Sequence, residues 1–530
     1  MSINIKTVLI SESVDPSCAR ILSENGVKVT TKTGLTKDQL KEEIKHYDGL
    51  IVRSATKVTS EIIEAGKQLK IIGRAGVGVD NIDCDAATRN GVLVINCSGG
   101  NTLSAAELTC GMIVSLSRNI PEACASLKSG KWERKNFMAS ELLGKTLAII
   151  GLGRIGREVA SRMQSFGMTT IGYDPLVPAH ESVKFGVESM ELEKIWPVAD
   201  YITVHTPLIP QTKNLINLDV FSKCKKGVKI INCARGGIVD EDALLSALES
   251  SQCSGAGLDV YLEEPPKNTK LIQHPKVICT PHLGASTYEA QSRVADEISN
   301  QFVELNAGRS AHGIVNSPAF CLSMAKVNKP WVTLTKYAGA LVSVLFPETE
   351  RDLSLTLTVH GPDLHRKESL FSTAALIGVL KQRNHLNANF INAPTLAEEK
   401  GYKVSGVDVS SAKVEGTLPI SVLLVAKSAS QTHSVKATFW GEEPLLCAID
   451  GCDFNIPHPF SDNLIVCKGT YSADTTVNIL GALMEKGVVS TISWSTVDNK
   501  FWCAISSSIT CDGMPNSVSK YADLWAQLNL

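Results

Sequence analysis

Residues 146–156 read Thr-Leu-Ala-Ile-Ile-Gly-Leu-Gly-Arg-Ile-Gly, so an apolar run leads directly into a glycine-rich segment. Such a run is typical of a strand buried on both faces of a parallel sheet. The glycines Gly151, Gly153 and Gly156 fit the pattern G-x-G-x-x-G, and a helix-like segment, Arg157–Phe166, follows. The first glycine permits a tight turn, the second lets a pyrophosphate approach the backbone, and the third lets the helix pack closely on the strand. This segment therefore predicts a dinucleotide site at a helix N-terminus, where free N–H groups favour anions.

The next predicted strand ends at Asp174, about 20 residues beyond the glycine loop. A carboxylate at this place binds the ribose hydroxyls of NAD and repels the additional phosphate of NADP. The expected cofactor is therefore NAD. Arg154 lies inside the loop, where it either covers the pyrophosphate or is a solvated charge.

The glycine loop belongs to a block of alternating strand-like and helix-like segments from Leu147 to Gly284, and residues 1–100 form a second such block. This alternation indicates parallel sheets with helices on both faces. We therefore predict an α/β protein with two Rossmann- or flavodoxin-like domains and a cleft between them. A helix over Ser104–Leu127 should be kinked or split by Pro121. The predicted strands are Thr7–Ile10, Gly49–Arg53, Leu69–Arg74, Gly91–Asn96, Thr146–Ile150, Thr169–Tyr173, Tyr201–Thr206, Val228–Cys233, Ser254–Val260 and Lys276–Thr280, and a helix should follow from Tyr288 to about Ala307.

The sequence changes character after Asn316. The turn-rich residues Asn316–Pro330 are interpreted as a linker. Residues 316–455 are assigned to an intervening α+β domain, which contains none of the motifs discussed here. Residues 456–530 form a second α+β unit, with the predicted order strand Leu464–Thr470, helix Asp474–Lys486, strands Val489–Ser495 and Phe501–Ser507, and a final helix near Ser519–Leu528.

Three polar segments follow predicted strands of the glycine-loop block, at the edge where open α/β sheets bind their ligands. They contribute Arg235, Glu264 and His282. A guanidinium makes planar two-point contacts to a carboxylate, an imidazole exchanges protons near neutral pH, and a carboxylate favours the charged imidazole. The set suits hydride transfer from a small 2-hydroxy acid, with Gly236 and Gly237 interpreted as space for that substrate. Taken singly, the three residues also fit a surface charge, a charged turn and a structural histidine.

The bulk composition excludes several other classes of protein. The 530 residues require three or more domains, and their formal net charge of −2 offers no general attraction for nucleic acid or anionic membranes. No apolar run is long enough to span a membrane, and residues 1–10 do not read as a secretory signal. The 15 cysteines include no C-x-x-C pair, so we expect no metal site, reduced thiols and a cytoplasmic location.

Together these motifs resemble those of the D-2-hydroxyacid dehydrogenases, over residues 1–315. Besides the glycine loop, the resemblance rests on the segments Arg53–Thr59, Gly73–Asn81, Cys233–Gly237, Asp259–Pro265 and His282–Ser286. It implies a catalytic set of Arg235, Glu264 and His282, with His282 as the acid–base. The implied NAD contacts are Val77, Gly151, Gly153, Arg154, Ile155, Gly156, Asp174, Thr206, Cys233, Ala234, Arg235, Asp259, His282, Leu283, Gly284 and Ala285. Val77 departs from the pattern, because related animal enzymes often have threonine there.

The resemblance also implies a domain plan. Residues 1–99 and 287–315 would form a substrate domain, and residues 100–286 would form the NAD-binding domain. The cofactor domain would carry the dimer interface of a homo-oligomer, with a tetramer as the expected assembly. Hinge closure over the cleft would exclude water from the reaction.

Within this family the chain is most similar to the long animal enzymes that oxidise 3-phosphoglycerate to 3-phosphohydroxypyruvate in serine synthesis. Arg53 and Arg74 each follow an apolar strand beside the predicted cleft, where they would bind the phosphate. Arg134, with Lys135 beside it, would reach the substrate from a dimer partner, although both also fit a solvated face. Arg235 and His282 would hold the hydroxy-acid end.

Residues 456–530 resemble the small-molecule-sensing ACT domain. Serine-inhibited bacterial relatives carry an asparagine and a Pro-Gly pair in the loop after its first strand. Here that loop, Gly469–Thr475, has neither. The module is therefore expected to serve assembly rather than serine feedback.

Two other functions share much of this sequence pattern. A glyoxylate or hydroxypyruvate reductase would share the cofactor domain but would not need Arg53 and Arg74 or the long C-terminal region. A non-catalytic, NAD-sensing corepressor scaffold would share even the catalytic residues. Its hallmark would be a Pro/Ser-rich disordered tail, whereas residues 316–530 read as folded.

Overall fold

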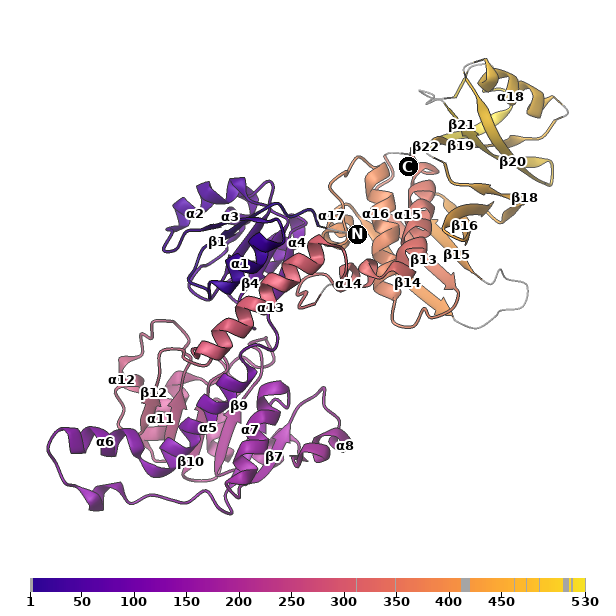
Figure 1. Cartoon of the computed structure of the whole chain (residues 1–530). Helices are drawn as coiled ribbons and strands as arrows, with labels where there is room; N and C mark the ends of the chain where they lie inside the picture. Colours follow the sequence, from indigo (N-terminus) through magenta and orange to yellow (C-terminus); the bar gives the residue numbers. More distant parts are fainter. Residues whose placement is uncertain are drawn as a thin grey trace.

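The computed structural model describes residues 3–529, apart from residues 311, 348, 411–419, 462, 473, 486, 509–513, 516 and 517. Within these residues the chain forms four bodies, each built on one β-sheet (Figure 1). We call them the N-terminal domain, the glycine-loop domain, the intervening domain and the terminal module. The first two contain only parallel strands, as predicted.

The N-terminal domain has five strands in the order β2-β1-β3-β4-β5. Its central strands are apolar runs because helices cover both faces of the sheet. The returning helix α13 closes one face, where Ile298 and Phe302 join the core. The elements are β1 (Thr7–Ile10), α1 (Ser17–Glu24), β2 (Lys28–Thr31), α2 (Lys37–Glu43), η1 (Ile44–His46), β3 (Gly49–Val52), α3 (Ser60–Ala65), β4 (Ile71–Arg74), α4 (Cys84–Arg89), β5 (Leu93–Asn96) and α13 (Tyr288–Asn306).

The glycine-loop domain has seven strands in the order β12-β11-β10-β9-β6-β7-β8. The strand order reverses between β6 and β9, and ligands of such sheets bind at this reversal. The elements are α5 (Thr102–Arg118), α6 (Ile120–Lys128), η2 (Arg134–Phe137), β6 (Thr146–Ile150), α7 (Arg154–Ser165), β7 (Thr169–Tyr173), α8 (Ala179–Ser182), η3 (Val183–Phe185), β8 (Glu188–Ser189), α9 (Leu192–Ile195), β9 (Tyr201–Val204), α10 (Leu218–Lys223), β10 (Val228–Asn232), α11 (Glu241–Glu249), β11 (Cys253–Leu258), α12 (Thr269–Ile272) and β12 (Val277–Cys279).

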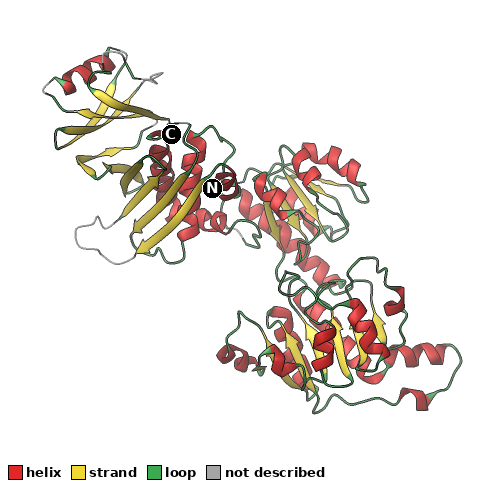
Figure 2. Cartoon of the chain, turned by 180° about the vertical axis from the view of Figure 1, so that it is seen from behind, coloured by secondary structure: helices red, strands yellow, loops and turns green. Residues whose placement is uncertain are grey.

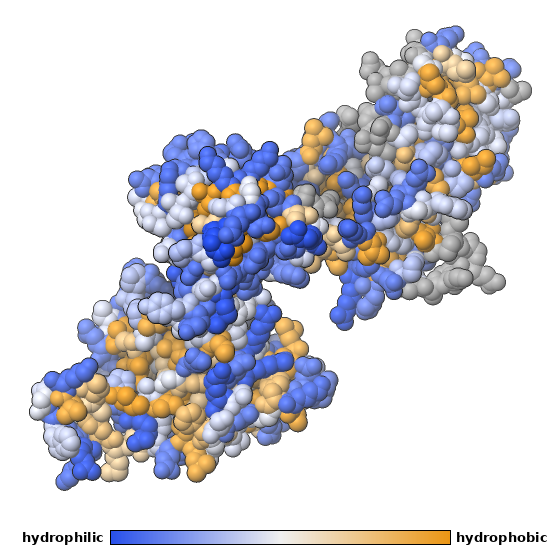
Figure 3. All heavy atoms as spheres, viewed as in Figure 1, coloured by the Kyte–Doolittle hydropathy of each residue, from blue (hydrophilic) through white to orange (hydrophobic). Residues whose placement is uncertain are grey.

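An arm extends from the glycine-loop domain, formed by α6, η2 and the residues up to Leu143 (Figure 1; Figure 2). The helix predicted over Ser104–Leu127 is split, as expected, with Asn119 in a left-handed conformation between α5 and α6. None of the residues of α6 is buried. Figure 3 shows apolar surface on this domain. The exposed large apolar side chains of the arm are Ile120, Leu127, Trp132, Met138 and Leu143.

The intervening domain packs helices against one mixed sheet, β14-β13-β15-β16-β17-β18. The interpretation of Asn316–Pro330 as a linker was wrong: α14 lies in this stretch, and its Phe320 and Met324 are buried. The elements are α14 (Pro318–Met324), η4 (Lys326–Asn328), α15 (Lys329–Val344), β13 (Leu353–His360), α16 (Glu368–Gln382), α17 (Ala393–Glu399), β14 (Tyr402–Ser410), β15 (Ser421–Lys427), β16 (Thr432–Trp440), β17 (Glu443–Ile449) and β18 (Cys452–Pro459).

The terminal module is an antiparallel sheet in the order β20-β21-β19-β22, with α18 on one face. Its elements are β19 (Asn463–Thr470), α18 (Thr475–Met484), β20 (Val489–Val497), β21 (Lys500–Ser507) and β22 (Ala522–Asn529). The predicted final helix near Ser519–Leu528 was wrong, because this segment pairs with β19 as β22. Pairing along a whole strand overrides the helical preference of Ala, Leu and Gln in β22.

The buried side chain of His458 joins the last two bodies. It lies on β18, with Nδ1 3.0 Å from Ser493 Oγ of β20 and Nε2 2.9 Å from Ser506 Oγ of β21. Burial lowers the pKa of His458 to about 4. The imidazole is therefore neutral in the folded chain at neutral pH.

Candidate active site

A cleft of about 490 Å³ lies between the N-terminal and glycine-loop domains. It is lined by residues that follow strands of both parallel sheets, because the carboxyl ends of β3, β4, β9 and β10 face one another across it. Residues that line it include Arg53, Arg74, Val77, Asp80, Asn101, Ile155, His205, Thr206, Cys233, Ala234, Arg235, His282, Gly284 and Ala285. The structure thus brings together the catalytic set, the two arginines proposed for phosphate and much of the expected NAD site.

The glycine loop has the geometry that a dinucleotide requires. A Cβ at Gly156 would lie 2.1 Å from the carbonyl oxygen of Gly151, so glycine lets α7 pack on the loop. A Cβ at Gly153 would have no atom within 4 Å, which leaves open space above this residue. The carboxylate of Asp174 accepts hydrogen bonds from the backbone N–H groups of Leu152 and Leu176, each at 2.8 Å. These residues fit NAD: the open space at Gly153 would admit a pyrophosphate, and Asp174 would be available to the ribose hydroxyls.

The side chain of Arg154 is exposed and contacts Ser98. Its Nη1 donates to the carbonyl oxygen of Ser98 at 2.6 Å and lies 3.0 Å from Ser98 Oγ. Ser98 belongs to the segment that connects β5 with α5. In this structure Arg154 therefore ties the glycine loop to the connection between the two domains.

His282 and Glu264 form the pair expected of an acid–base site. Nδ1 of His282 lies 2.8 Å from Oε2 of Glu264, and the backbone N–H of Tyr261 donates to Oε1 at 3.3 Å. Partial burial raises the pKa of Glu264, but the hydrogen bond and charge of His282, with smaller effects of Tyr261 and Arg235, outweigh it and leave this pKa below its usual value. Glu264 is therefore ionised at neutral pH and able to stabilise a protonated imidazole.

Asp259 shapes the loop that carries His282. Its side chain is fully buried and accepts from Thr280 Oγ1 and Leu283 N at 2.6 Å each, and from Gly284 N at 2.8 Å. Because both of its carboxylate oxygens accept hydrogen bonds, Asp259 fixes the turn at Leu283 and Gly284. His282 itself has a positive φ of 56°, a conformation this support helps to maintain.

Arg235 reaches across the cleft from the residues that follow β10. Its Nε donates to Oδ2 of Asp80 in the N-terminal domain at 2.8 Å, and its Nη1 donates to the carbonyl oxygen of Ala234. The interpretation of Gly236 as open space for the substrate was wrong. A Cβ there would lie 1.7 Å from the carbonyl oxygen of Tyr261, so this glycine permits a close approach between two loops.

Three guanidinium groups share the cleft. Burial, together with the nearby charges of Arg235 and Arg53, lowers the pKa of Arg74 to about 10. The buried Nε of Arg74 has no hydrogen-bond partner among the described residues. Gly76, at φ 151°, makes room for this side chain, since a Cβ there would lie 1.6 Å from Arg74 Nη1. This concentration of positive charge suits an anion with several oxygens.

Two of the expected substrate residues lie elsewhere. Arg134 and Lys135 are on η2 in the arm, are exposed, and do not line the cleft of their own chain. Conversely, the sequence reasoning missed His205 and Asp80, which do line it. Burial lowers the pKa of His205 to about 4, and its Nε2 lies 3.0 Å from Thr203 Oγ1. Its position directly after the apolar strand β9 was the available signal.

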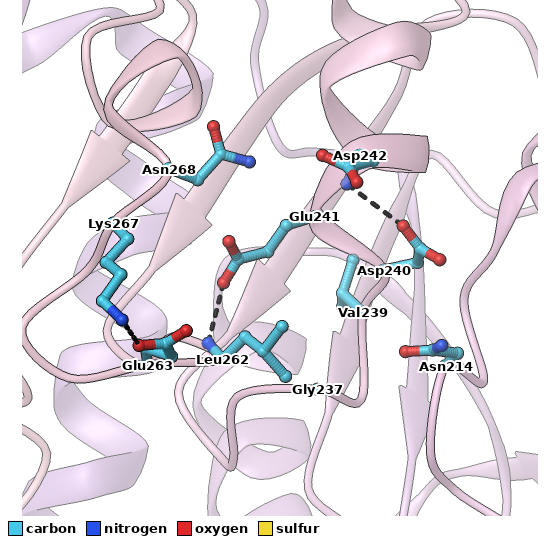
Figure 4. A pocket seen from close by; sticks show the side chains of 10 residues that line it. All are labelled: Asn214, Gly237, Val239, Asp240, Glu241, Asp242, Leu262, Glu263, Lys267 and Asn268. Carbon is cyan, nitrogen blue, oxygen red and sulfur yellow. Dashed lines mark hydrogen bonds and ion pairs between the residues drawn. The ribbon is translucent and has the colours of Figure 1, made fainter.

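A second cavity, of about 420 Å³, lies beside the Glu264 loop (Figure 4). Its lining carries the carboxylates of Asp240, Glu241, Asp242 and Glu263. Oε1 of Glu241 accepts from the backbone N–H of Leu262 at 2.8 Å, so α11 supports the loop that carries Glu264. Among the described residues, no group of three or more histidines, cysteines or acids is placed to hold a metal ion.

Comparisons with known proteins agree with this site. A family model described as the NAD binding domain of D-isomer specific 2-hydroxyacid dehydrogenases matches residues 110–284. The D-3-phosphoglycerate dehydrogenase of Sus scrofa is 47% identical, covering 93% of this chain and 92% of its own. The enzyme of the same name from Homo sapiens is also 47% identical, over 92% and 91%, and that of Bacillus subtilis is 42% identical, over 84% and 86%.

Solved structures of dehydrogenases are similar over more than half of this chain. The D-lactate dehydrogenase of Aquifex aeolicus, complexed with NAD and lactic acid, has a TM-score of 0.54 at 28% identity and covers 59% of this chain and 100% of its own. An NAD-dependent formate dehydrogenase from Staphylococcus aureus in complex with NAD has a TM-score of 0.53 at 30% identity, over 59% and 99%. With the parallel sheets, the glycine loop and the His282–Glu264 pair, these similarities show that the chain is an NAD-dependent dehydrogenase and belongs to the D-3-phosphoglycerate dehydrogenases of the D-isomer specific 2-hydroxyacid dehydrogenase family.

Proposed function

We propose that the chain oxidises 3-phosphoglycerate to 3-phosphohydroxypyruvate, the first step of serine biosynthesis by the phosphorylated route. The observation that carries this proposal is the cluster of Arg53, Arg74 and Arg235 in one cleft with the His282–Glu264 pair. A substrate that carries both a carboxylate and a phosphate matches this concentration of positive charge in one cleft. The names of the relatives support the same substrate.

The proposed roles follow from this geometry. His282 accepts the proton of the 2-hydroxyl, and Glu264 stabilises the imidazolium that forms. Arg235 holds the carboxylate, and Arg53 and Arg74 hold the phosphate. When NAD is bound, it supplies the hydride acceptor. The chain holds it through Gly151, Gly153, Gly156 and Asp174, with Val77, Ile155, Thr206, Cys233, Ala234, Gly284 and Ala285 along the cleft.

We propose that residues 1–99 and 287–315 act as the substrate domain and residues 100–286 as the cofactor domain. Val77 lines the cleft. Its carbonyl oxygen accepts a hydrogen bond from Asn96 Nδ2 at 2.5 Å. The missing threonine hydroxyl is harmless if this position serves through its backbone. Closure of the two domains would exclude water from the bound substrate.

A homo-oligomer completes the proposal. The exposed apolar side chains of the arm suit a dimer through the glycine-loop domain. Such a dimer would carry Arg134 to the partner's cleft, and two dimers would form a tetramer. We place the enzyme in the cytoplasm, since every cysteine among the described residues is free. Separately, no described helix has the length and apolar character needed to cross a bilayer.

The test is NADH formation by the purified protein with 3-phosphoglycerate, glycerate and lactate, alongside reduction of hydroxypyruvate. We expect strong preference for the phosphorylated acid. The variant His282→Ala should lower turnover by about 10²–10⁴-fold while NADH still binds. Activity on hydroxypyruvate alone would replace the proposal with a reductase. NAD binding without turnover of any substrate would instead favour the non-catalytic scaffold.

A further inference from the structure

The side chain of Asp80 is the acid that meets Arg235 from the opposite wall of the cleft. It comes from the residues after β4 in the N-terminal domain, whereas Arg235 comes from the residues after β10 in the glycine-loop domain. The two are 155 positions apart in the chain, and Oδ2 of Asp80 accepts from Nε of Arg235 at 2.8 Å. The side chain of Asp80 is 57% exposed and that of Arg235 is 27% exposed, so the pair lies at the mouth of the cavity.

The backbone around Asp80 is shaped to receive the guanidinium. A Cβ at Gly78 would lie 1.8 Å from Nη2 of Arg235 and 2.8 Å from Oδ2 of Asp80. Only glycine therefore lets the tip of Arg235 enter the turn between Gly78 and Asp80. Gly78 and Asp80 of the N-terminal domain thus form a close-fitting binding site for Arg235 of the glycine-loop domain.

The contacts of Arg235 determine which part of its guanidinium is left for a ligand. Nε is taken by Asp80 and Nη1 by the carbonyl oxygen of Ala234. Nη2 has no hydrogen-bond acceptor among the described residues of the cleft. Because the guanidinium is planar and its donors are fixed relative to one another, holding Nε fixes the direction of Nη2.

Charge gives Asp80 a second reason to lie there. Arg74, Arg53 and Arg235 repel one another within a single cavity, and Asp80 is one of two acids whose charge acts against this repulsion at Arg74. The other acid is Glu12, which accepts from the backbone N–H groups of Arg53 and Thr56 instead of a guanidinium. Asp80 is thus the acid that contacts a guanidinium of this cluster directly.

We propose that Asp80 is a positioning residue for the reaction, which holds Arg235 so that Nη2 is presented to the carboxylate of the 2-hydroxy acid. The inference rests on the proposed function, in which Arg235 binds that carboxylate. Asp80 is not required to touch the substrate. Its effect should therefore depend on Arg235 being present.

The experiment is a double-mutant cycle on the full-length protein, read by the Kd of 3-phosphoglycerate for the enzyme–NADH complex. This readout does not require turnover. Asp80→Ala should weaken binding by about 10-fold or more, the loss expected when a charged hydrogen bond no longer holds its partner. Asp80→Asn keeps an oxygen for Nε and should lose less. In an Arg235→Gln background, Asp80→Ala should have little further effect, because the residue it positions is gone.

Two controls separate positioning from a general loss of structure. Asp85→Asn changes an exposed acid of α4 and should leave the Kd unchanged. NADH affinity and Tm should be the same in the Asp80 variants as in the wild type. Equal losses from Asp80→Ala with and without Arg235 would overturn the proposal, and so would tighter binding by Asp80→Ala, which would make Asp80 a competitor of the substrate.

The outcomes also separate this inference from the function on which it rests. If wild type binds 3-phosphoglycerate and the cycle is additive, only the role of Asp80 is wrong. If wild type does not bind 3-phosphoglycerate, the substrate is wrong. The same cycle is then decisive with the 2-hydroxy acid that the enzyme oxidises, because every such acid carries the carboxylate assigned to Arg235.

Discussion

Glu264 holds the imidazole of His282 with one carboxylate oxygen and the N–H of Tyr261 with the other. The pKa of Glu264 in the folded chain lies below the usual pKa of a glutamate. The ionised carboxylate therefore stabilises the fold at every pH above that usual pKa. The contribution is lost as pH falls through the lowered pKa. Glu264→Gln should therefore lower the Tm at pH 7, and the difference in Tm from wild type should narrow only as pH falls below the usual glutamate pKa of 4.5.

The neighbouring acid provides a matched control for this prediction. Glu263 pairs with Lys267 on the surface, and its side chain is 54% exposed. Glu263→Gln should change the Tm little at any pH, since exposed pairs contribute little to stability. A Tm difference for Glu264→Gln that stays constant as pH falls from 7 to well below 4.5 would mean that its carboxylate is not the group responsible.

Arg53 permits a prediction about substrate choice. It lines the cleft, and its Nη1 donates to the carbonyl oxygen of Ser13 at 3.2 Å. Arg53→Ala should raise the KM for 3-phosphoglycerate by about 10- to 150-fold, as expected when one charged hydrogen bond is lost. The KM for glycerate, which has no phosphate, should stay close to that of wild type. Equal increases for the two acids would remove Arg53 from the phosphate site.

At the level of elements, β6, the glycine loop and α7 form one unit in which two glycines have different tasks. Gly156→Ala places a methyl group 2.1 Å from a backbone oxygen that cannot move aside, so it should destabilise the fold by about 1–3 kcal/mol. Gly153→Ala meets no atom within 4 Å and should leave the Tm unchanged. It should nevertheless weaken NADH binding at least about 10-fold, because its methyl group would occupy the space proposed for the pyrophosphate.

Calorimetry and NADH fluorescence titration measure the two effects separately. The two variants add the same group three residues apart, so each serves as the control for the other. Normal NADH affinity in Gly153→Ala would show that the phosphates do not approach this residue. A Tm change of similar size in both variants would contradict the assignment of different tasks.

The elements that the sequence predicted well are those whose pattern is imposed locally. The parallel strands β1 and β6 have the predicted bounds, because buried apolar runs leave little choice of conformation. The missed strand β2 is a partly exposed edge strand, Lys28–Thr31, without such a run. The strand β22 depends on pairing with β19, a contact across more than 50 residues that composition does not reveal.

The same division applies to the candidate site. Arg235 and His282 could be predicted to converge because the carboxyl ends of parallel strands share one edge of the sheet. Asp80 and His205 could not be predicted as site residues. An acid or a histidine after a strand can be assigned a role only when the residues on the opposite side of the cleft are known. The misplaced role of Gly236 has the same origin, because the loop that approaches it contains Tyr261, 25 positions later.

For the whole molecule, the junction between the intervening domain and the terminal module depends on the neutral His458. The unfolded chain protonates this histidine near its ordinary value of 6.5, whereas the folded chain resists protonation down to about pH 4. The free energy by which neutral His458 stabilises the junction is therefore fully present above pH 6.5, and it decreases as pH falls from 6.5 to 4. The loss reaches roughly 3 kcal/mol when both states are protonated.

Amide hydrogen exchange in β20 and β21 should report this effect. When pH is lowered from 7 to 5, the exchange rates of these amides should fall less than the intrinsic, pH-dependent rates of exchange predict. His458→Asn, whose amide does not titrate, should remove the additional pH dependence. His312, an exposed histidine of the N-terminal domain, provides the control, since His312→Asn should leave it in place. Persistence of the effect in His458→Asn would assign it to another group.

The path of the chain has a consequence for synthesis on the ribosome. The strands β1 to β5 are complete by residue 96, but one face of their sheet is covered by Ile298 and Phe302 of α13. At 5–20 residues per second, about 10–40 s pass before α13 has been made. During that interval the glycine-loop domain is translated in full and can fold. The first domain to begin emerging is thus the second to be finished, and its bare apolar face is the place where a nascent-chain chaperone is most needed.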